Sequence, residues 1–257
     1  MYFSSLLSLI YLATTQASPI ASKQYERAAK PAAFFLAGDS TTAIKGGWGN
    51  GFLTLLTNGA IGTNFGHSGA TTKSFVAGGD WAKVISAVKA NSEKYTTYVT
   101  IQFGHNDQKE AANISLPQFT TNLKRMTLDV LSAGGHPILT TSLTRRTFSG
   151  GKVIENLSEQ VAATLQVAKD QKVQSIDLNK ASTAYINAVG QANADKYNLE
   201  SGDRTHVNPE GELLFGNMVA WLIESSTDEG LGAQTESFLA PKTEVVEAIE
   251  AGKFILP

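Results

Sequence analysis

Short apolar runs recur along the chain, and each ends at a glycine or at a group of polar residues. The run Phe34–Ala37 stops at Gly38, which is the pattern of a strand that is covered on both faces and closed by a turn. Further runs of this kind are Ile61–Phe65, Tyr98–Phe103, Pro137–Thr141 and Val173–Asp177. We therefore expect a sheet whose strands are buried.

The segments between these runs carry apolar residues at the three- to four-residue spacing of an amphipathic helix. Between residues 116 and 133, for example, Phe119, Leu123, Met126 and Val130 fall on one helical face. In chain order, helices are predicted at about Gly51–Leu56, Trp81–Ala90, Leu116–Ala133, Glu155–Gln171, Ala181–Val189, Pro209–Glu224 and Thr243–Ala251.

The alternation of strands and helices predicts the fold class. Parallel strands joined by right-handed helical crossovers form a three-layer α/β/α sandwich with a parallel, flavodoxin-like central sheet. The chain has 257 residues, of which 42% are hydrophobic and 17% charged, as is typical of one globular domain. We place this domain at residues 31–225, with residues 226–257 as an extension that packs on it or follows it.

The N-terminal segment 1–17 has the pattern of a secretory signal peptide. An apolar core, Leu6–Leu12, is followed by the small-residue exit Thr15-Gln16-Ala17-Ser18, and the core is too short to span a bilayer. A disordered tail is the alternative. Residues 18–30 are polar and are expected to form a flexible leader. The pattern predicts a secreted, extracellular protein.

Charge and cysteine content exclude several function classes. The net charge is −2 without a basic cluster, so neither nucleic acid nor a membrane surface is expected as a partner. The chain has no cysteine, which excludes disulfides, a thiolate nucleophile and a cysteine metal site. We expect a monomer without a cofactor or metal. Asn113 and Asn156 begin Asn-x-Ser sequons, which are possible glycosylation sites in a secreted chain.

A candidate catalytic set begins at Ser40, which follows the first strand and Gly38. A serine hydroxyl becomes nucleophilic when an imidazole takes its proton and a carboxylate orients that imidazole. Among the four histidines, His206 lies three residues after Asp203 and just before a helix. The alternatives are a turn serine at Ser40, a surface salt bridge between Asp203 and His206, and a metal site of these two with His105.

Acyl transfer also needs donors aimed at the developing oxyanion. The backbone N–H of Ser40, the backbone N–H of Gly69 and the side-chain amide of Asn106 each follow a different predicted strand. In a parallel sheet these three donors face the same edge. The alternative for Asn106 and its neighbour Asp107 is that they cap the segment that follows them.

These residues carry a resemblance to a known family. The sequence contains, in order, Gly38-Asp39-Ser40, Gly69, Gly104-x-Asn106 and Asp203-x-x-His206. The four blocks resemble those of the SGNH (GDSL-type) hydrolase superfamily. Within it, Gly-Asp-Ser-Thr followed by Gly-Trp-Gly, Phe-Gly-His-Asn-Asp and Asp-x-Thr-His-x-Asn is similar to fungal and bacterial rhamnogalacturonan acetylesterases.

The resemblance implies an α/β/α fold and the removal of acetyl groups from pectin through an acyl-serine intermediate. It implies that Ser40 is the nucleophile, His206 the base and Asp203 its orienter. Gly69 and Asn106 match the family's oxyanion donors. The chain departs from the pattern at Ala70, where many members have arginine. His67 and His105 are expected to be hydrogen-bonded structural residues, because one base suffices.

Two further features concern the substrate. Arg145 and Arg146 follow the fourth strand and could pair with carboxylates of an acidic polysaccharide, or they form a solvated loop pair. Trp48 could stack on a sugar or belong to the core.

We therefore predict a secreted serine esterase that deacetylates a plant cell-wall polysaccharide, with acetylated rhamnogalacturonan as the leading substrate. The alternatives are a lipase or thioesterase on the same scaffold, and a catalytically silent carbohydrate-binding protein.

Overall fold

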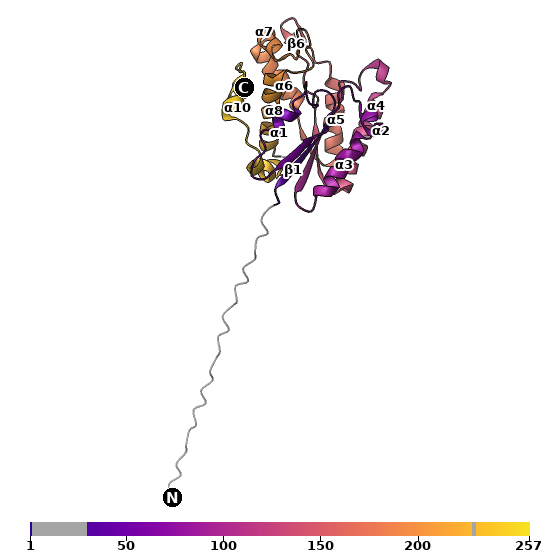
Figure 1. Cartoon of the computed structure of the whole chain (residues 1–257), viewed down its shortest axis with the longest axis vertical. Helices are drawn as coiled ribbons and strands as arrows, with labels where there is room; N and C mark the ends of the chain where they lie inside the picture. Colours follow the sequence, from indigo (N-terminus) through magenta and orange to yellow (C-terminus); the bar gives the residue numbers. More distant parts are fainter. Residues whose placement is uncertain (2–29, 228–229) are drawn as a thin grey trace.

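The computed structural model describes residue 1, residues 30–227 and residues 230–257. The predicted signal peptide and leader therefore lie outside the described residues, except for Met1 and Lys30. The rest is a central sheet between two helical layers (Figure 1). No helix in the described ranges is long and apolar enough to cross a membrane.

The central sheet is parallel throughout and has the strand order β2-β1-β3-β4-β7. The strands are β1 (Ala32–Gly38), β2 (Ile61–Asn64), β3 (Thr96–Gln102), β4 (His136–Thr140) and β7 (Gln174–Ile176). This is the flavodoxin-like order, in which the direction of winding reverses between β1 and β3. The predicted fold class is confirmed.

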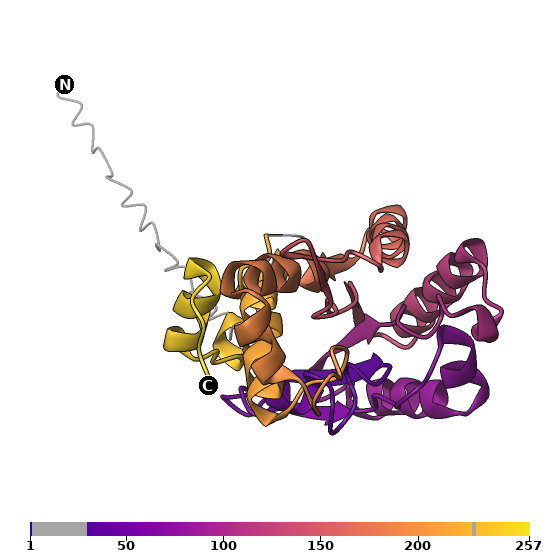
Figure 2. The ribbon, with the colours of Figure 1, turned by 90° about the horizontal axis from the view of Figure 1, so that it is seen from above.

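Alternate residues of β1, β3 and β4 enter two separate cores. Phe34 packs with the core beneath α1, α6, α8 and α10, whereas Phe35 packs with the core beneath α2, α3, α4 and α5. The first group of helices is α1 (Gly49–Leu53), α6 (Leu178–Val189), α8 (Pro209–Glu224) and α10 (Thr243–Ala251); the second is α2 (Thr72–Ala77), α3 (Asp80–Asn91), α4 (Leu116–Ser132) and α5 (Ser158–Gln171). Figure 2 shows the orange and yellow helices on one side of the molecule and the magenta helices on the other.

The predicted elements differ from the observed ones mainly where short elements depend on tertiary contacts. Helix α1 ends at Leu53 rather than Leu56, because Leu56 forms an isolated bridge to Leu239. The short helix α2 was not predicted, although Thr71 and Ser74 form a capping box at its start. Other short elements without a sequence prediction are β5 (Phe148–Ser149), β6 (Lys152–Val153), α7 (Gln191–Ala194) and α9 (Leu231–Thr235).

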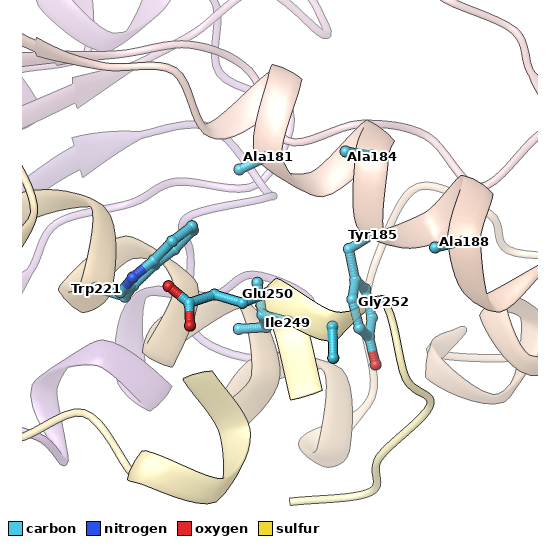
Figure 3. A pocket seen from close by; sticks show the side chains of 9 residues that line it. Ala181, Ala184, Tyr185, Ala188, Trp221, Ile249, Glu250 and Gly252 are labelled. Carbon is cyan, nitrogen blue, oxygen red and sulfur yellow. The ribbon is translucent and has the colours of Figure 1, made fainter. Parts of the chain in front are cut away.

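The C-terminal helix α10 spans the predicted residues and packs on α8. Its residues Val245 and Ile249 are buried in the same core as α8. A cavity of about 410 Å³ lies between α6, α8 and α10. Figure 3 shows the carboxylate of Glu250 directed towards Trp221, with Ala181, Ala184 and Ala188 along the neighbouring helix. No residue of the candidate catalytic set lines this cavity.

Candidate active site

Ser40 lies in a tight turn directly after β1. The backbone N–H groups of Thr42 and Ala43 donate to the carbonyl of Asp39, and the Asp39 carboxylate accepts from the backbone N–H and hydroxyl of Thr41. A Cβ at Gly38 would lie 2.2 Å from the Thr42 hydroxyl, so only glycine fits at this point. The turn therefore holds the Ser40 hydroxyl in place at the carboxyl edge of the sheet.

The structure brings Ser40, His206 and Asp203 into one hydrogen-bonded chain. The Nε2 atom of His206 lies 2.8 Å from Ser40 Oγ, and its Nδ1 atom lies 2.8 Å from Asp203 Oδ2. The two residues of the loop before α8 thus reach the serine after β1, which is 166 positions earlier in the chain. This is the geometry that an activated serine nucleophile requires.

The Asp203 carboxylate remains charged despite partial burial. Burial raises its pKa, but hydrogen bonds from the backbone N–H and imidazole of His206 and from the Thr205 N–H outweigh this effect and lower it. A charged Asp203 favours the His206 tautomer with hydrogen on Nδ1. The Nε2 lone pair then faces Ser40 and can accept its proton.

The three candidate oxyanion donors lie around the winding reversal between β1 and β3. Within the described chain, no hydrogen bond is formed by the backbone N–H of Ser40 or Gly69. Asn106 Nδ2 donates to the carbonyl of Ala70 at 3.0 Å, and its Oδ1 accepts from Lys109. These contacts orient the Asn106 amide, whose second hydrogen stays available for a ligand.

A buried acidic and imidazole cluster supports this edge of the sheet. His105 is 2% exposed, and its Nδ1 atom lies 3.5 Å from Asp39 Oδ2. Asp107 accepts from the backbone N–H and hydroxyl of Thr72 at the start of α2. Asp107 therefore ties the end of β3 to the start of α2 rather than capping the segment that follows it. His105 contacts the nucleophile turn and does not join Asp203 and His206 in a metal site. The described residues contain no group of three metal-ligating side chains.

The structure corrects two of the expected substrate contacts. Trp48 is fully buried and its Nε1 donates to Gln102 Oε1 at 2.7 Å, so its ring cannot stack on a sugar. Gln102 in turn donates to Thr41, which joins Trp48 to the nucleophile turn. Arg146 is also fully buried, so its guanidinium cannot pair with a substrate carboxylate.

Arg146 instead holds the loop that carries the base and the acid. Its Nη2 atom donates to the carbonyls of His206 at 2.5 Å and Asp203 at 3.4 Å, and its Nε donates to Asn198 Oδ1 at 2.8 Å. Burial lowers the pKa of Arg146 to about 10, although Asp203 and Asp195 attract the charge. The side chain stays protonated at neutral pH. No sequence pattern distinguishes this buried arginine from its neighbour Arg145.

We predict that Arg146→Met lowers both stability and turnover. The change leaves buried carbonyls without a donor, and each such loss costs ~1–3 kcal/mol, so unfolding in urea should require ~3 kcal/mol less. Turnover should fall at a temperature where the variant is folded, because the loop of His206 loses its anchor. Arg125→Met, at an exposed arginine of α4, is the control. Equal stability and turnover of the two variants would refute the role of Arg146 in holding the loop of His206.

Arg145 is only half buried and lies between the site loops. It donates to the carbonyl of His105, to Thr205 Oγ1 and to Asn156 Oδ1. Contact with substrate stays a prediction for this residue. Asn113 and Asn156 are exposed, and their glycosylation also stays a prediction.

A flavodoxin-like sheet with a serine, a histidine and an aspartate hydrogen-bonded at its carboxyl edge defines a serine hydrolase of the GDSL type. The chain belongs to the GDSL-like Lipase/Acylhydrolase family, whose model matches residues 36–214. This finding confirms the resemblance that the four sequence blocks indicated.

Individual relatives agree with this family. The chain is 31% identical over 215 residues to the rhamnogalacturonan acetylesterase RhgT of Bacillus subtilis, covering 76% of this chain and 90% of the relative. In structure it is similar to the Bacillus subtilis protein YXIM, with a TM-score of 0.66, 22% identity and coverage of 76% of this chain and 57% of that one. A catalytic mutant of Axe2, an acetylxylan esterase from Geobacillus stearothermophilus, gives a TM-score of 0.57 with 17% identity, covering 76% of this chain and 94% of that chain.

Proposed function

We propose that the protein is a secreted carbohydrate acetylesterase that removes acetyl groups from a plant cell-wall polysaccharide, with acetylated rhamnogalacturonan as the leading substrate. The observation that carries the proposal is the hydrogen-bonded chain of Ser40, His206 and Asp203. Beside it lie the backbone N–H groups of Ser40 and Gly69, which bond to no group in the described part of the chain. The relative RhgT, which is named a rhamnogalacturonan acetylesterase, supports the choice of polymer. Secretion is supported by the signal-peptide pattern of residues 1–17.

The first half of the reaction transfers the acetyl group to the enzyme. His206 Nε2 takes the hydroxyl proton of Ser40 while Ser40 Oγ bonds to the acetyl carbonyl carbon. The carbonyl oxygen becomes an oxyanion that accepts hydrogen bonds from the N–H groups of Ser40 and Gly69 and from the Asn106 amide. The intermediate collapses when the sugar oxygen leaves with the proton held by His206.

The second half regenerates the serine. His206 takes a proton from a water molecule, whose oxygen bonds to the carbonyl carbon of acetyl-Ser40. The same donors stabilise the second oxyanion. Collapse breaks the bond to Ser40 Oγ, which recovers its proton from His206, and acetate leaves. No step needs a metal or cofactor.

Acetate release from acetylated rhamnogalacturonan, with acetylated xylan in parallel, tests the proposal. We expect release from the pectic polymer and a preference for acetyl over octanoyl among p-nitrophenyl esters. Release from both polymers would support the esterase function and would show a broader range of polysaccharide substrates. A preference for the octanoyl ester, without release from either polymer, would favour a lipase.

A further inference from the structure

A polar pocket opens beside the oxyanion donor Gly69. It has a volume of about 340 Å³ and is lined by residues of the segment after β2, of α2 and of the start of α3. The lining residues that bear on its chemistry are His67, Ser68, Gly69, Asp80 and Lys83. Of these residues, only Gly69 belongs to the four sequence blocks that indicated the family.

The pocket is tied to the catalytic turn by backbone contacts. The N–H of His67 donates to the carbonyl of Gly38 at 3.0 Å, and Gly38 lies two residues before Ser40. On the other flank, Ala70 accepts from the Asn106 amide. Nothing within 4 Å would meet a Cβ at Gly69, whose φ is +80°. The pocket is therefore open at the point where the reacting ester must meet its oxyanion donors.

Inside the pocket, a carboxylate holds one imidazole in a fixed orientation. Asp80 Oδ2 lies 2.6 Å from His67 Nδ1, and Asp80 Oδ1 lies 2.8 Å from Lys83 Nζ. The side chain of Asp80 is 14% exposed, whereas those of His67 and Lys83 are 61% and 66% exposed. Asp80 is thus the anchor, and the other two side chains reach the solvent.

The anchored imidazole presents a hydrogen-bond acceptor to the pocket. The hydrogen bond from Lys83, and then that from His67, lower the pKa of Asp80 against the opposing effect of burial, and the start of α3 also favours its charge. A charged Asp80 favours hydrogen on Nδ1 of His67, so in the neutral imidazole it is Nε2 that carries the lone pair. No protein group in the described chain donates to this Nε2.

We propose that this pocket is a subsite for a sugar ring of the substrate, in which His67 Nε2 accepts a hydrogen bond from a sugar hydroxyl. The inference rests on the proposed carbohydrate esterase function. The volume of the pocket lies near the lower end of the ~300–1,000 Å³ range of ligand pockets, as suits a single sugar ring. Asp80 and Lys83 balance each other in charge, so the subsite suits a neutral, hydroxylated ring rather than a carboxylate.

Kinetics of His67→Ala on two small acetates tests the subsite. The substrates are a monosaccharide acetate with free hydroxyls, and p-nitrophenyl acetate, which has no sugar. We expect the ratio of kcat/KM for the sugar acetate to that for p-nitrophenyl acetate to fall about 3- to 10-fold, mainly through KM, as for one lost hydrogen bond. Asp80→Asn should change the ratio in the same direction, because a neutral amide no longer favours hydrogen on Nδ1 of His67.

His136→Ala is the matched control. His136 begins β4, at the sheet edge opposite the catalytic residues, and its replacement should leave the ratio unchanged. An unchanged ratio in His67→Ala would overturn the subsite, even if both rates fell, since that result would show a structural role for the loop. If the wild-type enzyme cleaves the sugar acetate but no polysaccharide, the proposed polymeric substrate is refuted. The ratio of the two kcat/KM values would still test the subsite in that case.

Discussion

Ser40→Ala is expected to abolish acetate release, with kcat reduced by about 10⁴–10⁶. The hydroxyl is the only group within hydrogen-bond distance of His206 Nε2 in the described chain, and without it no acetyl-enzyme can form. Residual hydrolysis would come from the oxyanion donors and from binding alone. The result is read as initial rates on p-nitrophenyl acetate and on acetylated polymer.

Folding and identity of the nucleophile need separate controls. Ser40→Ala should unfold close to the wild-type temperature, because loss of the hydroxyl removes only one hydrogen-bond partner of His206. Ser132→Ala, at the exposed end of α4, should keep full activity. A folded Ser40→Ala enzyme with more than about one hundredth of the wild-type rate would show that another group attacks the ester.

The fold and the catalytic set could be predicted because both are written in local patterns. Strand β1 is a continuous apolar run that a glycine closes, and α8 begins at the capping residue Asn208 followed by Pro209. The four sequence blocks then needed only the parallel sheet to bring them to one edge. Asp203 and His206 lie on one turn, so their contact is local as well.

Two predicted substrate contacts were wrong because the burial of these side chains depends on long-range packing, which no local sequence pattern indicates. Arg146 and Arg145 are adjacent and alike in sequence, yet the backbone N–H of Arg146 bonds to the carbonyl of Arg204 and directs its side chain beneath the catalytic loop. Trp48 is buried because Gln102, 54 residues away, accepts from its indole. The pocket at His67 could not be predicted from the sequence either, because Asp80, which holds the imidazole, belongs to the separate helix α3.

Asp203→Asn is expected to lower kcat by about 10⁴ while the protein stays folded. The asparagine oxygen can still accept from the backbone N–H groups of Thr205 and His206, as Asp203 Oδ1 does at 3.0 Å. Its amide nitrogen would face His206 Nδ1, however, and would favour hydrogen on Nε2. That hydrogen would point at Ser40, so the imidazole could not take the serine proton.

The pKa of Asp203 sets the pH range in which this deficit should be observed. The lowered pKa of Asp203 keeps the wild-type carboxylate ionised above its ordinary value of 3.8, so the variant should be deficient at every pH from about 5 to 8. Stability follows the same sign: the charged form stabilises the fold above the unfolded pKa, and this contribution is lost as the pH falls through the folded pKa.

Asp195→Asn, which removes the partner of Arg204 at 3.0 Å, is the control and should keep nearly full activity because that pair is partly exposed. A deficit of Asp203→Asn below tenfold would mean that His206 finds its tautomer without the carboxylate, and the assignment of Asp203 as its orienter would fail.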